Sequence, residues 1–178
     1  MSTTPNPPKA WIANLRESSG GTDLRSLDPI ERDALDSAVP FAAEHARRYI
    51  ASNGQDDGWD GPRPILLLYT TGKKTGVIRR NPVLFFDHEG ERFIIGSKGG
   101  DAAHPQWFTN LVANPEVHIR VAAVFYAAIA EVVEEGVRAQ VWPILTAHYE
   151  MFAAYQLRSD RQIPLVRLRP IGTDGIAS

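Results

Sequence analysis

The sequence predicts a mainly β fold of the α+β class, in which antiparallel strands close fully or partly into a small barrel and helices pack outside it. Segments of strand character outnumber helical ones, and the turns between them read as hairpin turns, which imply antiparallel pairing. The regular strand–helix alternation of a doubly wound sheet is absent. With 178 residues the chain can bury the core of one globular domain without a metal or a disulfide.

Hydrophobic periodicity places the strands in the second and third thirds of the chain. Residues 65–69 are apolar throughout, as expected for a strand that is buried on both faces. Residues 117–121 alternate between apolar and polar, and the strand that follows is their hairpin partner. Strands are predicted over residues 65–69, 81–87, 92–96, 117–121, 125–133 and 163–168, and helices over residues 103–113 and 136–155.

Composition divides the chain into three parts. Residues 1–27 contain clustered prolines, glycines, serines and threonines and are predicted to form a flexible arm. Residues 28–63 are predicted to be a helical extension and a loop, in which Asp28 caps a helix and Pro40 interrupts the pattern. Two short helices, or one helix kinked at Pro40, both fit. Residues 64–178 hold the barrel.

Composition also limits the possible functions. The chain has no cysteine, which removes disulfides, zinc–thiolate sites and thiolate nucleophiles from consideration. Its 19 basic and 21 acidic residues give a net charge of −2, whereas a general nucleic-acid binder is normally basic, so no nucleic-acid partner is expected. The five histidines lack metal-ligand spacing, so no metal site is expected. Without a signal-peptide core or a stretch of ~20 apolar residues, we expect a cytoplasmic protein.

Two basic, glycine-containing loops follow neighbouring strands. The first, residues 72–76, reads GKKTG and continues to Arg79 and Arg80 without an acidic residue. The second, residues 97–100, reads SKGG. Glycines let a backbone approach an anion and cations neutralise it, so the two loops could converge on one small anion. The spacing does not match a Walker A loop, and a plain hairpin turn uses the same residue types.

The neighbours of these loops favour an anion site. Arg79 and Arg80 occupy successive strand positions, so only one of them can face the site. Asn81-Pro82 limits that strand to a sheet edge or to a strand start. The helix that opens after His104 could add the backbone N–H groups of its N-terminus.

Five motifs in this order resemble the deazaflavin-dependent nitroreductase family. They are YTTGKKTG from Tyr69, RRNP from Arg79, SKGG from Ser97, HPQWFTNL from His104 and NP at Asn114. The similarity continues through Trp142 to Ile163 and covers residues 64–170. It implies a split β-barrel over residues 64–178 that binds coenzyme F420, a deazaflavin with a phospholactyl-polyglutamate tail. It also implies an oxidoreductase that passes hydride from reduced F420 to a quinone, an enone or a nitroaromatic compound.

The resemblance further implies which residues meet the cofactor. The family's cofactor-binding positions correspond to Lys74, Thr75, Arg79, Asn81, Pro82, Ser97, Lys98, Gly99, Trp107 and Asn110. Lys74, Thr75 and Arg79 would contact the tail and the phosphate, and most of the others would line the ring and its ribityl chain. Trp107 and Asn110 would close the pocket. Related split barrels bind FMN, but five basic residues around the two loops favour the longer, more anionic tail of F420.

Tyr149, Phe152 and Tyr155 recur at every third position and share one face of the predicted helix, as an ordinary core stripe would. In the resembled family, tyrosines at comparable positions line the substrate pocket and assist proton delivery. This makes Tyr149 and Tyr155 the catalytic candidates and Phe152 a substrate-binding residue. Because Phe152 has no hydroxyl, nitroreduction is in doubt, whereas hydride transfer itself needs no dedicated acid–base pair.

The sequence leaves three alternatives open. The same barrel could bind F420, FMN or a fatty acid without turnover. With a small-molecule hydride acceptor as its partner, the chain could act as a monomer or as a homodimer. The arm, residues 1–27, could dock on the body of the protein or associate peripherally with a membrane.

Overall fold

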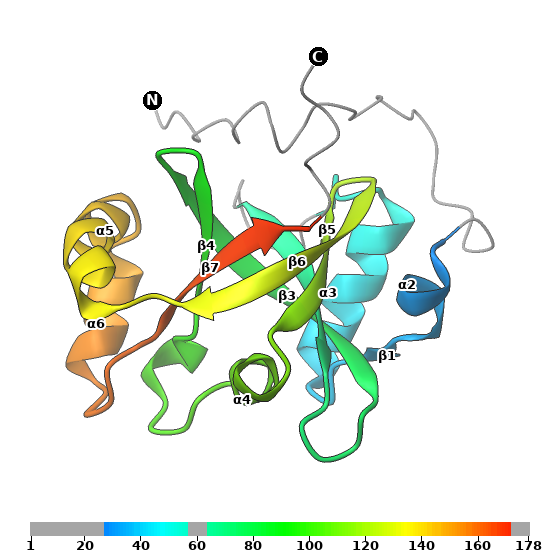
Figure 1. The fold of residues 1–178 in the computed structure, drawn as a ribbon, viewed down its shortest axis with the longest axis horizontal. Helices are drawn as coiled ribbons and strands as arrows, with labels where there is room; N and C mark the ends of the chain where they lie inside the picture. Colours follow the sequence, from blue (N-terminus) through cyan, green and yellow to red (C-terminus); the bar gives the residue numbers. More distant parts are fainter. Residues whose placement is uncertain (1–26, 57–63, 172–178) are drawn as a thin grey trace.

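The computed structural model describes residues 27–56 and 64–171, and its centre is a closed antiparallel barrel of six strands with helices outside (Figure 1). The strands are β1 Leu35–Asp36, β2 Ile65–Thr71, β3 Ile78–His88, β4 Glu91–Ile95, β5 Glu116–Val121, β6 Val124–Val132 and β7 Leu165–Pro170. The helices are α2 Pro29–Asp33, α3 Pro40–Ala51, α4 Gln106–Ala113, α5 Glu135–His148 and α6 Met151–Leu157, with a 3₁₀ turn, η2, at Lys98–Gly100. The barrel order is β3-β2-β5-β6-β7-β4, and pairing of β3 with β4 closes it. The predicted fold class is confirmed.

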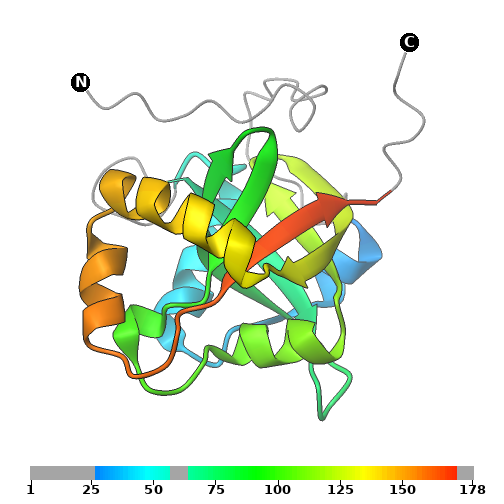
Figure 2. The same ribbon diagram turned by 60° about the vertical axis from the view of Figure 1, so that its left-hand side comes forward.

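Side-chain alternation along β2 connects two parts of the core. Leu66 and Leu68 belong to the cluster that includes residues from all six barrel strands. Ile65, Leu67 and Tyr69 belong to a second cluster that lies beneath α3. The strand is therefore buried on both faces, as its apolar sequence predicts. A third cluster lies beneath α5 and α6, which cover another side of the barrel (Figure 2).

The N-terminal extension belongs to the same folded body. The predicted helix start is confirmed, because Asp28 Oδ1 accepts a hydrogen bond from Ile30 N at 2.8 Å. Two helices are present, but the segment between them is a strand: β1 pairs in parallel with Arg79 and Arg80 of β3. Pro40 begins α3 and interrupts no helix, since the first helical position needs no N–H donor.

A buried ion pair attaches this extension to the barrel. Glu31 is 1% exposed and accepts two hydrogen bonds from Arg120 Nη1, each at 3.0 Å, and one from the Tyr69 hydroxyl at 2.8 Å. Burial and the negative charge of Glu31 strongly raise the pKa of Tyr69, which therefore stays a hydrogen-bond donor. Removing one partner of such a pair leaves a buried charge uncompensated and costs about 3–5 kcal/mol.

The prediction of one helix over residues 136–155 is wrong, because the chain bends at Tyr149, which has an extended backbone (φ −128°, ψ 81°). The Tyr149 N–H donates to the Leu145 carbonyl and completes α5, while its own carbonyl accepts from Phe152 N and leads into α6. The Tyr149 ring packs edge-on against Phe86 of β3, with 6.4 Å between ring centroids. The bend therefore lets both helices follow the curved wall of the barrel.

No helix in the described parts of the chain is long and apolar enough to cross a membrane. The predicted arm lies outside the described residues except for Leu27. Its predicted docking or membrane association therefore stays a prediction.

Candidate functional site

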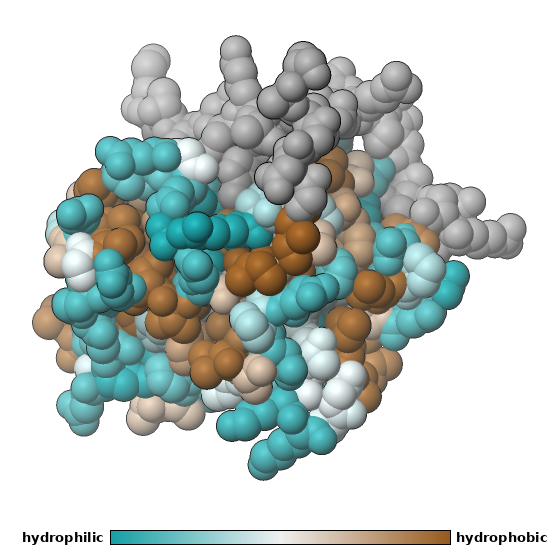
Figure 3. All heavy atoms as spheres, viewed as in Figure 1, coloured by the Kyte–Doolittle hydropathy of each residue, from teal (hydrophilic) through white to brown (hydrophobic). Residues whose placement is uncertain are grey.

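The two glycine loops lie at the same end of the barrel. Loop 1 (residues 72–76) is the turn between β2 and β3, and loop 2 (residues 96–101) follows β4, which runs antiparallel to β3. Both loops therefore lie at the lower end of the molecule in Figure 1, with α4 between them. Figure 3 shows that the lower tip of this face is hydrophilic.

Loop 1 is a hairpin turn closed by its own backbone. Gly72 N donates to Val77 O at 2.8 Å, and Gly76 N donates to Gly72 O at 2.9 Å. The Thr75 hydroxyl accepts a hydrogen bond from Val77 N at 3.2 Å, which completes the turn. Gly76 has a φ of +70°, a conformation that glycine adopts without steric cost.

Helix α4 holds loop 1 from the barrel side. Asn110 is 3% exposed; its Oδ1 accepts from Lys73 N at 3.1 Å and its Nδ2 donates to Thr70 Oγ1 at 3.3 Å. One turn later, Asn114 Nδ2 donates to Thr71 O at 3.3 Å. These bonds fix the backbone of loop 1, while its two lysine side chains are exposed and form no ion pair within the described chain. Asn110 thus acts on the loop, and its polar atoms are already engaged.

The two arginines that follow loop 1 both reach the N-terminal extension. Arg80 Nε donates to Asp36 Oδ1 at 2.7 Å in a largely buried ion pair. Arg79 Nη1 donates to the backbone carbonyl of the same residue, also at 2.7 Å. A backbone carbonyl carries no full charge, so its hydrogen bond does not neutralise the positive charge of Arg79. The charge of Arg80, in contrast, is compensated by the Asp36 carboxylate. Of the two, Arg79 is the one whose charge is available at this end of the barrel.

Strand β3 has a free edge between the two loops. It begins at Ile78, three residues earlier than predicted, and runs through Pro82. It pairs with β1 near its start and with β4 only from Phe85 onward, so residues 81–84 have no partner on that side within the described chain. A proline is tolerated there because it has no N–H to donate. Of the two predicted alternatives for Pro82, the sheet edge is correct.

Loop 2 has an unusual backbone. Ser97 is in the right-handed region (φ −74°, ψ −41°), and Lys98 and Gly99 follow with φ of +46° and +64°. This alternation turns successive N–H groups to one side and makes a concave anion site known as a nest. The amides of Ser97, Lys98 and Gly99 make no hydrogen bond within the described chain. The Lys98 ammonium lies 3.6 Å from the Asp101 carboxylate in an exposed ion pair, which contributes little.

Helix α6 packs directly against loop 2, and both views show the two elements adjacent (Figure 2). Gly100 has a φ of +84°, and a Cβ atom there would lie 2.7 Å from the carbonyl oxygen of Tyr155. Gly100 is therefore required both by the backbone conformation and by the close approach of the helix.

Two arginines from the connection between α6 and β7 bind the carbonyls of loop 2. Arg161 donates to Ser97 O at 2.8 Å, Asp101 O at 2.9 Å and Gly96 O at 3.1 Å. Arg158 Nη2 donates to Gly99 O at 3.0 Å. Neither arginine was predicted from the sequence. Their partners lie about 60 residues away along the chain, and an isolated arginine produces no local pattern.

His104 lies between loop 2 and α4. Its Nδ1 is 3.2 Å from Arg161 Nη1 and its ring packs on Phe108, with 4.6 Å between centroids. Since a guanidinium only donates, Nδ1 accepts and the ring proton resides on Nε2. Burial, and then the positive charge of Arg161, lower the pKa of His104. The neutral imidazole therefore helps to order the segment that leads into α4.

The aromatic residues predicted for the substrate side form an edge-to-face series. Tyr149 and Phe152 have ring centroids 6.3 Å apart, and Phe152 and Tyr155 are 6.0 Å apart. Phe152 is 3% exposed in the cluster beneath α5 and α6, while both tyrosines are half-buried. Trp107, which was predicted to close the cofactor pocket, is 8% exposed in the barrel core. The catalytic and substrate-binding roles of these residues stay predictions.

The groups at this end of the barrel fit a cofactor with several anionic groups. Loop 1 and Arg79 supply cations, and loop 2 supplies three converging amides. Around Gly76 and Gly99 a Cβ would meet no atom within 4 Å, so a ligand could approach the backbone there. A phosphate and a row of carboxylates, as in F420, match two separate anion-binding loops better than the single phosphate of FMN does. Within the described residues, no group of three or more His, Asp or Glu side chains could hold a metal ion.

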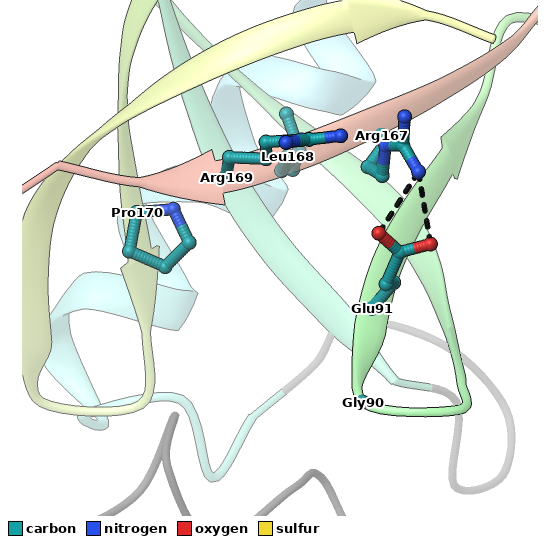
Figure 4. Close-up of a pocket in the computed structure, with 6 residues that line it drawn as sticks. All are labelled: Gly90, Glu91, Arg167, Leu168, Arg169 and Pro170. Carbon is teal, nitrogen blue, oxygen red and sulfur yellow. Dashed lines mark hydrogen bonds and ion pairs between the residues drawn. The ribbon is translucent and has the colours of Figure 1, made fainter. Parts of the chain in front are cut away.

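A pocket of about 190 Å³ lies elsewhere, at the other end of β3 (Figure 4). Its lining residues are Gly90, Glu91, Arg167, Leu168, Arg169 and Pro170. Arg167 Nη1 contacts both Glu91 carboxylate oxygens at 2.9 and 3.0 Å, so these charges already compensate each other. The pocket is smaller than the 300–1,000 Å³ typical of ligand sites. It is therefore not the candidate cofactor site.

Comparison with known proteins gives consistent matches. The model of the F420H(2)-dependent quinone reductase family matches residues 42–170. The F420H(2)-dependent quinone reductase Rv1261c of Mycobacterium tuberculosis is 36% identical over 111 residues, which cover 61% of this chain and 74% of that protein. The solved structure of an F420-H2 dependent reductase, FDR-A, is 34% identical with a TM-score of 0.54, and the match covers 60% of this chain and 95% of FDR-A. A structure described as a domain-swapped dimer is 32% identical with a TM-score of 0.56, covering 71% of this chain and 96% of its own.

Proposed function

Because the chain belongs to the F420H(2)-dependent quinone reductase family, we propose that it reduces a quinone with the hydride that reduced coenzyme F420 supplies. The chain is an oxidoreductase, and its cofactor is coenzyme F420. The observation that carries this proposal is the family match across the barrel, which includes both glycine loops and the helix between them.

Each element at the end of the barrel that carries loops 1 and 2 has a proposed role in binding the cofactor. Loop 1, through Lys74 and Thr75, and Arg79 bind the glutamate tail. Asn81 and Pro82, on the free edge of β3, form a wall for the ring. The amides of loop 2 bind the phosphate beside the ribityl chain, which extends the role that the family resemblance implies for that loop. The support is the separation of uncompensated cations in loop 1 from converging amides in loop 2.

On the substrate side, Tyr149 and Tyr155 are the hydroxyl groups able to donate a proton to a reduced quinone, and Phe152 packs between their rings. Positioning and exclusion of water are the main tasks of a protein around such a cofactor. If Tyr149→Phe and Tyr155→Phe both keep wild-type turnover at every pH, neither hydroxyl delivers a proton.

The function is tested by mixing the purified protein with reduced F420 and a quinone and following the return of deazaflavin absorbance. Rapid reoxidation that depends on both protein and quinone is the expected result. Tight binding of F420 without reoxidation would favour a carrier, and absence of binding would exclude both.

The loop assignment is tested by measuring F420 affinity for Lys74→Ala and Lys98→Ala. Each lost charge-assisted contact is expected to cost on the order of 1.5–3 kcal/mol of binding free energy. Arg32→Ala is the control, because Arg32 is exposed on α2 and pairs with its neighbour Asp33. Wild-type affinity in both lysine variants would contradict the assignment.

A further inference from the structure

We propose that Arg161 is a positioning residue of the cofactor site: by holding the carbonyls of loop 2 it directs the amides of that loop toward a negatively charged group of the cofactor. The inference rests on the proposed function, because the negatively charged group is that of F420. It assigns a role to a residue from the connection between α6 and β7, which follows the substrate-side helices and lies in neither glycine loop.

The geometry of the peptide unit links the carbonyls to the amides. In a planar trans peptide the C=O of one residue and the N–H of the next point in opposite directions. Arg161 binds Gly96 O and Ser97 O, so the N–H groups of Ser97 and Lys98 point away from its guanidinium. The peptide unit that carries the third amide, of Gly99, is fixed without Arg161, because Asp101 N donates to Lys98 O at 3.1 Å.

The conformation of loop 2 needs this support. Lys98 has a φ of +46°, and the left-handed region is sterically unfavourable for a residue with a side chain. Such a backbone persists when its surroundings over-determine it. The planar guanidinium of Arg161 meets three carbonyls at 2.8–3.1 Å, and a lysine ammonium could not satisfy this fork-like arrangement.

Arg161 is itself held in place from α6. Gln156 Nε2 donates to Arg161 O at 2.8 Å, and Gln156 Oε1 accepts from Ile163 N at 2.8 Å. The Arg161 side chain forms no ion pair within the described residues, so its charge also adds to the positive field at this end of the barrel. Arg161 can therefore support cofactor binding both through its positive charge and through the geometry of its hydrogen bonds. A lysine variant keeps the charge and loses the geometry, whereas an alanine variant loses both.

The experiment compares Arg161→Ala and Arg161→Lys with wild type by two measurements. The first is the equilibrium Kd for F420, from which we expect a roughly tenfold to hundredfold rise in both variants. The second, on the protein without F420, is the NMR backbone order parameter of residues 97–99, which should fall in both. Arg167→Ala is the matched control: Arg167 also makes several partly buried contacts, but to Glu91 and Glu131 far from the loops, so stability should fall without a change in Kd.

The outcomes are distinct. If Arg161→Lys restores wild-type Kd and order parameters, Arg161 acts through charge alone and the inference is wrong. Unchanged Kd and order parameters in Arg161→Ala overturn it as well. If the alanine variant does not fold, Arg161→Lys decides alone: a raised Kd with lowered order parameters supports the inference, and wild-type values of both overturn it. If wild type fails to bind F420, the proposed function fails, while the order parameters still decide whether Arg161 fixes the loop.

Discussion

Loop 1 and loop 2 are both short, basic and rich in glycine, yet they are built differently. Loop 1 is a hairpin turn whose backbone bonds are internal or go to α4, and its lysine side chains extend into solvent. In loop 2 the side chain of Lys98 is exposed, and arginines bind four of the backbone carbonyls. The amides of residues 97–99 make no hydrogen bond within the described chain. One loop offers exposed charge, and the other offers a preorganised backbone.

This difference separates two ways of binding an anion. Flexible, exposed cations attract it over a distance, an effect that salt screens within about 10 Å. Fixed amides act only at contact, but they require no reorganisation when the ligand arrives. A cofactor with a long anionic tail and a compact phosphate could use both. The predictions below test this contrast, beginning with the largest expected effect.

Replacing Gly100 with alanine should damage loop 2 severely. The new methyl group would combine a left-handed backbone with a contact of 2.7 Å to the Tyr155 carbonyl. We expect the free energy of unfolding to fall by roughly 2–5 kcal/mol, measured by urea denaturation. Gly76→Ala in loop 1 is the control, because open space surrounds it; it should cost only about 1–2 kcal/mol. Equal losses would show that close packing does not distinguish the loops.

Asn110→Ala should loosen loop 1 and leave loop 2 intact. It removes the acceptor of Lys73 N and the partner of the buried Thr70 hydroxyl. A loss of about 1–3 kcal/mol in unfolding free energy is expected. Val112→Ala, on the exposed side of the same helix, should have little effect on stability. Amide exchange that becomes faster in loop 2 as well would indicate that the loops are not independently held.

Salt should affect the two loops unequally. In a Lys73→Ala, Lys74→Ala double variant, we expect the Kd for F420 to rise and its dependence on ionic strength to weaken, because the screened cations are gone. Arg161→Ala should raise the Kd while keeping most of the salt dependence, since the loop 1 cations remain. Titrations at several salt concentrations check both expectations. If the Kd depends on ionic strength equally in wild type and in both variants, the two loops do not bind the cofactor in different ways.

The smallest expected effect concerns pH and His104. Its pKa is lowered from the ordinary 6.5, so folding favours the neutral ring. The corresponding stability is complete above pH 6.5 and declines as the pH falls from 6.5 toward the lowered pKa of the folded protein. The charged group beside the ring is Arg161, whose guanidinium opposes protonation. An NMR titration midpoint for His104 at or above 6.5 would contradict this.

Much of the fold follows from local patterns. The apolar run of β2, the hairpin between the strands predicted over residues 81–87 and 92–96, and the helix start at Asp28 are predictable because each depends on neighbours within a few residues. The bend at Tyr149 and the strand β1 could not be predicted from such local patterns. Both depend on packing against β3, a strand that lies far away in the sequence.

The candidate site divides in the same way. The sequence by itself determined the residue types of the two loops, their order and their likeness to a family, since motifs are local. Three interactions are decided only by the tertiary structure. Asp36 forms an ion pair with Arg80, Asn110 accepts a hydrogen bond from the backbone of loop 1, and Arg161 binds carbonyls of loop 2. The physical reason is that a hydrogen bond depends on distance in space, and the barrel brings together residues that are about 40 to 60 positions apart.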